Sequence, residues 1–286
     1  MNVTRILFFL AGLTLAGAAR GGTLYAVDST NDNLYTLNKA TGAATLLGST
    51  GRNPIVGGLV YDSSTHRLIA SNLFLEGSID ARGIGFGTPG NPAFSAPNDY
   101  IFSLSTPSLA YHAPSDTLYG LSKNPYQLQT IDRATGASTV GPVPAGDPPT
   151  VVDLLAITFS VNGGTLYGVS EFGFHIVDRA TAQVTNVGAH GLDLDLFDGV
   201  GLTFDPDDGV LYLTDAENGN LYRVNPATGA ATLIGATGIS PSGIAAVRGS
   251  TVEVPTLGEV GTIALALLIG SMGAVLLRRR RAMVRG

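Results

Sequence analysis

The acidic residues in the second half of the chain are the first candidates for chemistry. Asp193, Asp195 and Asp198 lie within one short stretch, and several carboxylate oxygens that converge on one point form the kind of site that calcium prefers. The spacing does not match an EF-hand loop, because such a loop needs glycine at its sixth position, and Asp198 stands there if Asp193 is the first. The stretch therefore predicts either a calcium site of another kind or a solvated loop.

A second candidate site pairs Asp153 with Asp198. If Phe159 and Phe204 are aligned as equivalent positions of a repeat, both aspartates precede equivalent strands and approach the mouth of a central channel. Like charges brought together attract a cation or raise one pKa, which is an arrangement that hydrolases and lyases use. Other repeats lack a carboxylate at this position. A full ring of ligands is therefore not expected, and two ordinary loop carboxylates are the alternative.

No catalytic motif accompanies these carboxylates. The sequence has no glycine-rich phosphate loop, nucleophile elbow or paired-histidine helix motif, and its four histidines are scattered over different repeats (His66, His112, His175 and His190). Recurring tyrosines could form a carbohydrate-stacking surface, but residues repeated at one place in each unit mostly pack one unit against the next. The recurring tyrosines are Tyr25, Tyr35, Tyr119, Tyr167, Tyr212 and Tyr222. We assign no catalytic residue and expect these tyrosines in the core.

Short strands in a long repeat must position these residues. Ala-Thr-Gly occurs at 40–42, 134–136 and 227–229 and Ala-Thr-Ala at 180–182, so successive copies lie 94, 46 and 47 residues apart, the first step being two periods. Four strands every ~40–50 residues are typical of a β-propeller blade, because radial repetition protects the sheet edges. Five units fit, near residues 22–51, 55–107, 108–146, 150–190 and 196–238. We predict an all-β propeller of about five four-stranded blades.

The two ends of the repeat region complement each other. The first unit begins at its second strand, whereas residues 243–247 form a predicted first strand with no followers. Pairing these ends would close the ring and bury both strand edges, whereas an open β-solenoid, the alternative, needs no such pairing. The second unit is irregular, with five glycines and three prolines in residues 72–100. This segment predicts either a functional loop or a decayed blade.

Composition and charge exclude several kinds of protein. The absence of cysteine excludes a disulfide framework and thiolate metal sites. Of the 22 acidic residues, only Glu259 lies outside residues 20–256, whereas six of the 16 basic residues do, so this segment carries a net charge of −11. Such a surface repels phosphate backbones, and no nucleic-acid partner is expected.

Both ends of the chain have the pattern of targeting segments. Residues 1–19 combine Arg5 with an apolar run and small residues before Arg20, which is typical of a signal peptide. Residues 260–277 are an uncharged apolar run, long enough for a transmembrane helix, and a stop-transfer block follows them (Arg278, Arg279, Arg280 and Arg281). The positive-inside rule then places residues 20–250 outside the cytoplasm as an ectodomain, and residues 251–286 form a membrane-anchoring tail.

The tail carries a more specific motif at residues 254–261. It reads Val254, Pro255, Thr256, Leu257, Gly258, Glu259, Val260 and Gly261, and the apolar helix and a basic end at residues 278–285 follow. This order resembles the IPTL-CTERM class of bacterial C-terminal sorting signals, which is similar to the PEP-CTERM class. Val254 replaces the usual isoleucine and Val260 the usual tryptophan. The resemblance implies processing by an exosortase-type membrane protease in a Gram-negative bacterium, from an inner-membrane-anchored form with a periplasmic ectodomain toward the cell surface or extracellular matrix.

Export, sorting and the missing catalytic motifs together favour a non-enzymatic binding module for a protein or an extracellular polysaccharide. The wording of the repeats also resembles loosely defined propeller proteins among secreted bacterial chains, which supports the fold more than an activity. The rival hypothesis is a hydrolase or lyase that uses the channel-mouth carboxylates Asp153 and Asp198 with calcium as cofactor.

Overall fold

The computed structural model describes residues 22–31, 33–51, 53–54, 58–74, 82–95, 108–123, 126–146, 150–195 and 199–249. The predicted signal peptide at residues 1–19 and the predicted sorting tail at residues 251–286 lie outside these ranges. A search of the described residues finds no helix that is long and apolar enough to span a membrane. The one helical element within the described ranges is the short 3₁₀ helix η1, Ala113–Ser115.

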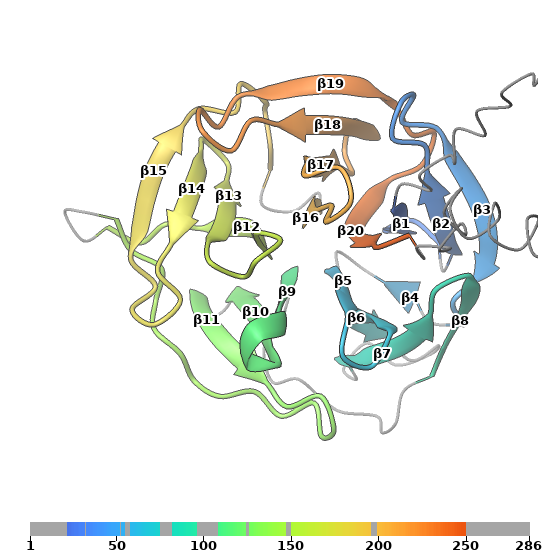
Figure 1. The fold of residues 1–286 in the computed structure, drawn as a ribbon, viewed down its shortest axis with the longest axis horizontal. Helices are drawn as coiled ribbons and strands as arrows, with labels where there is room; N and C mark the ends of the chain where they lie inside the picture. The colour runs from blue at the N-terminus through green and yellow to red at the C-terminus, as the bar shows by residue number, and fades with distance from the viewer. Residues whose placement is uncertain are drawn as a thin grey trace, which may run out of the picture. The chain divides into compact units, whose positions relative to one another are not determined.

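Antiparallel strands form five sheets that follow one another around a ring (Figure 1). The closing sheet has the order β20-β1-β2-β3, with bounds Pro241–Val247, Thr23–Asp28, Asn33–Leu37 and Ala44–Ser49. The β4–β8 sheet contains Asn53–Pro54, Leu59–Asp62, Arg67–Phe74, Arg82–Thr88 and Asn91–Ser95, in chain order. The β9–β11 sheet contains Ser108–His112, Thr117–Lys123 and Tyr126–Ile131. The β12–β15 sheet contains Leu154–Phe159, Leu166–Ser170, Phe174–Val177 and Val184–Gly188. The β16–β19 sheet contains Val200–Phe204, Leu211–Asp215, Asn220–Val224 and Ala231–Ala236.

The innermost strands hold the ring together. Strands β20, β5, β9, β12 and β16 contact one another in this order, and β16 contacts β20 again. Side chains join neighbouring inner strands, because Ala246 N donates to Thr203 Oγ1 at 3.1 Å and Ile157 N donates to Ser108 Oγ at 3.0 Å. This cyclic order confirms the predicted propeller-like arrangement.

The closing sheet joins the two ends of the repeat region as predicted. Strand β20 pairs with β1 in an antiparallel register that sets Ile244 opposite Ala26 and Ala246 opposite Leu24. All seven residues of β20 are buried. Burial of one large apolar side chain such as Ile244 stabilises the fold by roughly 1.5–3 kcal/mol. The pairing of β20 with β1 therefore contributes substantially to the free energy of unfolding.

The strand count differs from the prediction of about five four-stranded blades. Four of the sheets have at least the four strands of a complete blade, whereas the β9–β11 sheet has three. The number of complete blades is therefore four and not five. After β11 the chain still runs beside the sheet, with Thr139 N donating to Thr130 O and Leu128 N to Pro142 O. Pro142 and Pro144 lack the N–H groups that a regular fourth strand would need.

The irregular second unit contains more structure than its composition predicted. Strands β7 and β8 lie within residues 72–100, where we expected a functional loop or a decayed blade. Glycine alternates through β7 at 83, 85 and 87, a spacing that leaves one face of the strand without side chains. Pairing of β7 with β6, and of β8 with β7, therefore supplies the order that local propensity does not.

The Ala-Thr-Gly repeats form tight turns between the third and fourth strands. Gly42, Gly136 and Gly229 have φ angles of 81°, 71° and 78°, and Ala182 adopts the same left-handed region with φ 56°. The turns also touch the preceding sheet: a Cβ on Gly42 would stand 2.5 Å from Gly235 O. Glycine is required at that turn by both its φ angle and this close approach.

Most of the recurring tyrosines lie in or against the core, as predicted. Tyr25, Tyr212 and Tyr222 are buried members of core clusters, and Tyr119 and Tyr167 pack against such clusters while half-buried. Tyr35 is half-buried, and its hydroxyl accepts a hydrogen bond from Asn33 Nδ2 at 3.4 Å. Five of the six therefore belong to the core or pack against it, and Tyr35 lies outside the core clusters.

Candidate functional site

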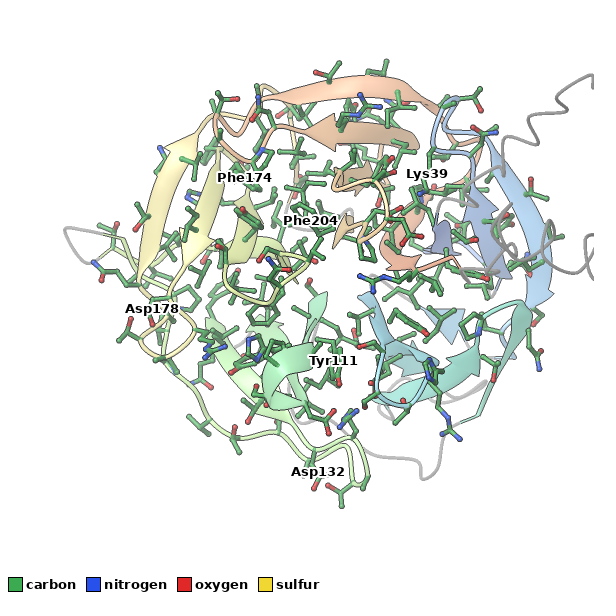
Figure 2. The ribbon with its side chains drawn as sticks, viewed as in Figure 1. Lys39, Tyr111, Asp132, Phe174, Asp178 and Phe204 are labelled. Atoms are coloured by element: carbon green, nitrogen blue, oxygen red, sulfur yellow. The ribbon has the colours of Figure 1, made fainter. Side chains whose placement is uncertain are left out.

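One face of the ring carries the turns that build the candidate site. We call the turn after the innermost strand of a sheet its inner turn, and the turn after the third strand its outer turn. In an antiparallel meander both turns lie at the same end of the sheet, and we call the face that they share the turn face. Figure 2 shows the labelled Tyr111 and Phe204 near the centre of the ring, and Asp132 and Asp178 at outer turns near its periphery.

A cavity of about 490 Å³ lies at the centre of the turn face, and we call it the mouth cavity. Every one of the five sheets contributes residues of its innermost strand or inner turn to the lining. The residues that matter below are Tyr61, Tyr111, Phe159, Phe204, Ala246 and Arg248. A site to which all the sheets contribute exists only in the closed ring.

The aromatic residues of the mouth cavity occupy one position of the repeat. Tyr61, Tyr111, Phe159 and Phe204 pair across the ladder with Leu68, Leu118, Leu166 and Leu211, respectively. Ala246 holds the equivalent position in the closing sheet, opposite Leu24. Alanine in place of a fifth ring leaves open space at the centre. The alignment of Phe159 with Phe204 in the sequence identifies this position in two of the repeats. It does not extend to Tyr61 and Tyr111, which occupy the same position in two others.

Polar groups surround the aromatic rings of the mouth cavity. The Tyr61 hydroxyl lies 3.0 Å from His66 Nδ1, and Arg248 is exposed, with an ion pair to Asp207 at 3.5 Å. Burial, followed by the charge of Asp62, raises the pKa of Tyr61, so its hydroxyl stays protonated at neutral pH. No carboxylate stands among the described residues that line this cavity. The arrangement suits binding of apolar faces and hydroxyl groups.

Basic residues at the outer turns connect neighbouring sheets around the turn face. Lys39, Arg133 and Arg179 each follow the asparagine or aspartate that begins an outer turn. Each side chain contacts the inner turn of the preceding sheet in the ring: Lys39 pairs with Asp205 and Asp208, Arg133 with Asp62, and Arg179 with His112. In the fourth such turn Pro226 replaces the basic residue. These contacts join residues that lie far apart in the sequence.

A cavity of about 880 Å³, the first junction cavity, lies where Arg133 meets Asp62. Asp62 is fully buried and accepts hydrogen bonds from Ser64 and Thr65, in addition to its pair with Arg133. Burial alone would raise the pKa of Asp62, but hydrogen bonds from Thr65, Ser64 and Arg133 outweigh this effect and lower it to about 2. Arg133 also pairs with Asp116 at 2.6 Å, so carboxylates neutralise its charge.

A cavity of about 730 Å³, the second junction cavity, occupies the equivalent place in the next junction. Here His112 stands where the first junction has Asp62, and Arg179 stands where it has Arg133. His112 is buried, and its Nδ1 lies 2.5 Å from Ser115 Oγ. Burial, followed by the charge of Arg179, lowers the pKa of His112, which therefore stays neutral at pH 7. Among the described residues, no carboxylate forms an ion pair with Arg179.

Both predicted carboxylate sites include Asp198, so they stay predictions. Asp193 and Asp195 are exposed, and Asp198 lies outside the described residues. Asp153 is half-buried. Burial raises the pKa of the nearby Tyr126 phenol, and the charge of Asp153 raises it further. Asp153 does not line the mouth cavity. A search of the described residues finds no group of three or more histidines and carboxylates that could share a metal ion. The sorting and stop-transfer residues between 254 and 281 also lie outside the described ranges.

Two histidines that the sequence separates meet at Ser170. The Ser170 hydroxyl lies 2.7 Å from His175 Nε2, and His190 Nε2 donates to Ser170 O at 3.0 Å, since Leu192 N donates to its Nδ1. Burial lowers the pKa of His175, and the electrostatic interaction with His190 lowers it further. All three residues are buried, and none lines the mouth cavity or either junction cavity. We assign them a structural role, because a serine nucleophile must be open to its substrate.

Comparisons with known proteins give only distant likenesses. No protein-family model matches the sequence, and no curated protein matches it. A chain of the crystal structure of a nidogen/laminin complex is similar over 79% of this chain and 98% of its own, with 13% identity and a TM-score of 0.49. An auxiliary nutrient binding protein from Bacteroides thetaiotaomicron is similar over 74% of this chain and 56% of its own, with 15% identity and a TM-score of 0.43.

Proposed function

We propose that the protein is a non-enzymatic binding module whose ligand is a segment of an extracellular polysaccharide seated in the mouth cavity. The observation that carries this proposal is the lining itself. All five sheets converge on one recess, where four of them contribute an aromatic ring from the same position of the repeat. Ligand sites are typically concave and mostly apolar, with a few polar groups that fix the orientation of the ligand.

The chemistry of the mouth cavity matches a sugar better than it matches an extended protein surface. Sugar rings present apolar C–H faces that contact aromatic side chains, and their hydroxyl groups exchange hydrogen bonds with groups such as Tyr61, His66 and Arg248. A protein partner would instead need about 800 Å² of complementary surface on each side. A recess of about 490 Å³ is closer to the size of a small ligand.

The proposal includes the location of the module. Residues 1–19 export the chain, the motif at residues 254–261 recruits an exosortase-type protease, and the helix at residues 260–277 anchors the ectodomain to the membrane. The patterns of the two ends support this part. Cell fractionation tests it: a chain without residues 254–286 should leave the membrane fraction, and its retention there would contradict the anchor.

The rival hypothesis, a hydrolase or lyase, has less support. It needs Asp153 and Asp198 together at a channel mouth, with or without calcium. Asp153 is half-buried, Asp198 lies outside the described residues, and no catalytic motif accompanies them in the sequence. Assays against glycosides, esters and lactones, with and without calcium, would favour the rival if turnover were lost in Asp153→Asn or Asp198→Asn.

The binding proposal is tested by filling the recess. Ala246→Phe places an aromatic ring where the other four sheets already have one, so we expect the fold to persist and the cavity to close. On a glycan array, the full-length wild-type protein should bind a defined set of oligosaccharides, and Ala246→Phe should weaken binding by at least about tenfold. Arg248→Ala should weaken it less, because Arg248 is exposed.

The matched control is Arg223→Ala, which removes an exposed arginine that does not line the mouth cavity. It should bind as the wild type does. Unchanged glycan binding in Ala246→Phe would contradict a ligand at the mouth. Binding of an envelope protein that is lost in Ala246→Phe, with no glycan bound by the wild type, would show that the ligand is a protein.

A further inference from the structure

The two junction cavities differ in how the charge of their arginine is neutralised. Arg133 and Lys39 each contact two carboxylates. Arg179 occupies the same position of its outer turn, yet the side chain that it meets on the preceding sheet is the imidazole of His112. A positive charge that faces a cavity without a carboxylate partner is the feature that an anionic ligand recognises.

The hydrogen bonding between Arg179 and His112 depends on which ring nitrogen of the imidazole carries the proton. His112 Nε2 lies 3.1 Å from Gly163 O and also contacts Arg179 Nη1. A single ring nitrogen cannot serve both partners, because it must carry a proton to donate to the carbonyl and must lack one to accept from the guanidinium. In the tautomer that donates to Gly163 O, Nε2 cannot accept, and Nδ1, which lies 3.3 Å from Nη1, also lies 2.5 Å from Ser115 Oγ. Arg179 can therefore give His112 at most one hydrogen bond, and the other N–H groups of its guanidinium remain available to another acceptor.

Asp178 is the carboxylate among the described lining residues of the second junction cavity, and its hydrogen bonds go to its own turn. Asp178 Oδ1 accepts hydrogen bonds from Ala180 N at 2.8 Å and from Thr181 N at 2.9 Å. Asp178 forms no ion pair with Arg179 within the described residues. Arg179 is exposed, so a ligand from solvent can reach the guanidinium.

The remaining walls of the second junction cavity offer neutral polar groups. Asn162 and Gln183 contribute amides, and Thr165 and Thr185 contribute hydroxyls. Amides and hydroxyls both donate and accept, as the hydroxyl groups of a sugar require. Phe159 and Gly163 line this cavity and the mouth cavity alike, so the two recesses adjoin.

We propose that the second junction cavity binds the carboxylate of an acidic sugar residue, a uronate, through Arg179, with Asn162 and Gln183 on its hydroxyl groups. This inference rests on the proposed function and names its ligand class: a polysaccharide chain seated at the mouth extends outward past Phe159 and places a uronate at Arg179. The planar guanidinium can donate two parallel hydrogen bonds to one carboxylate, which gives direction as well as affinity.

The test compares a trigalacturonate with its methyl ester, which keeps the sugar rings and removes the charges. Isothermal titration of the full-length protein should show the acid binding at least about tenfold more tightly than the ester. Arg179→Gln should abolish that preference, and Arg223→Gln, which replaces an exposed arginine outside both cavities, should retain it. His112→Asp, which recreates the first junction, should also abolish the preference while keeping the arginine.

Acetate distinguishes a free carboxylate from a sugar-borne one. Equal affinity for acid and ester in the wild type, or an acid preference that survives Arg179→Gln, overturns the inference and leaves the mouth site intact. Binding of neither oligosaccharide also overturns the uronate inference, whereas the proposed function fails only if the glycan array shows no bound oligosaccharide. If acetate then shifts the NMR signals of the second junction cavity in the wild type and not in Arg179→Gln, the site binds free carboxylates and the uronate assignment is wrong.

Discussion

The first and second junction cavities contain an arginine at the same position of the repeat, but the two arginines have different partners. Both are built from an outer turn that meets the inner turn of the preceding sheet, and both contain an arginine at the same turn position. In the first, Arg133 pairs with the buried Asp62 and with Asp116. In the second, Arg179 meets the neutral His112.

This difference indicates that the partner of a repeated charged residue, and not its position in the repeat, determines whether that residue stabilises the fold. A buried carboxylate that keeps its arginine and several hydrogen bonds is a structural element, because removal of the arginine leaves a buried charge without its cation. An exposed arginine beside a neutral imidazole contributes little to stability. It retains the donors that a ligand can use.

The largest expected effect lies in the first junction cavity. Asp62→Ala removes the acceptor of Ser64, Thr65 and Arg133 at once, and we expect a loss of about 3–5 kcal/mol in the free energy of unfolding. Urea unfolding monitored by circular dichroism measures it. The control Ser63→Ala changes an exposed residue of the same turn and should stay within about 0.5 kcal/mol of the wild type. Matching unfolding midpoints for the two variants would contradict a structural role for Asp62.

The two junction cavities should also lose their contributions to the free energy of unfolding in different pH ranges, which is a smaller effect. The pKa of Asp62 is lowered from 3.8 to about 2, so the stability that its ionised form contributes is present above pH 3.8 and lost as the pH falls toward 2. The pKa of His112 is lowered from 6.5, so its contribution is already lost as the pH falls below 6.5. The pKa of His175 is lowered as well, and both histidines act in the same window.

Unfolding curves recorded between pH 7 and pH 5 measure the histidine contribution. His112→Asn should flatten the pH dependence in this window, with the His175 share remaining, and should leave the loss between pH 4 and pH 2 unchanged. An unaltered slope between pH 7 and pH 5 in His112→Asn would show that the proton is taken up elsewhere.

Pattern alone predicted the closing sheet, because residues 243–247 supply the one strand that the first repeat lacks. It did not predict β7 and β8, because the glycines and prolines of residues 72–100 have low strand propensity. These strands form by pairing, β7 with β6 and β8 with β7. The three-stranded β9–β11 sheet was missed for the opposite reason. Regular spacing predicted a fourth strand where Pro142 and Pro144 prevent one.

The sites were less predictable than the fold. The pairing of Asp153 with Asp198 stays a prediction, because Asp198 lies outside the described residues. The turn-face mouth lies at the other end of the innermost strands, beyond Phe159 and Phe204, and was not predicted. The aromatic position was visible in the repeats once Tyr61 and Tyr111 are aligned with those phenylalanines. The junction pairs were not visible, because Lys39 and Asp205 are 166 residues apart and meet only when the ring closes.

The central claim, that Arg133 holds the fold while Arg179 serves a ligand, is tested most directly by the stability of two matched variants. Urea unfolding of the ligand-free full-length protein should show that Arg133→Ala loses about 1.5–3 kcal/mol, because Asp62 stays buried without its cation. Arg179→Ala should change the free energy of unfolding by no more than about 0.5 kcal/mol. Equal losses in the two variants would contradict the account, because Arg179 would then be a structural residue like its counterpart.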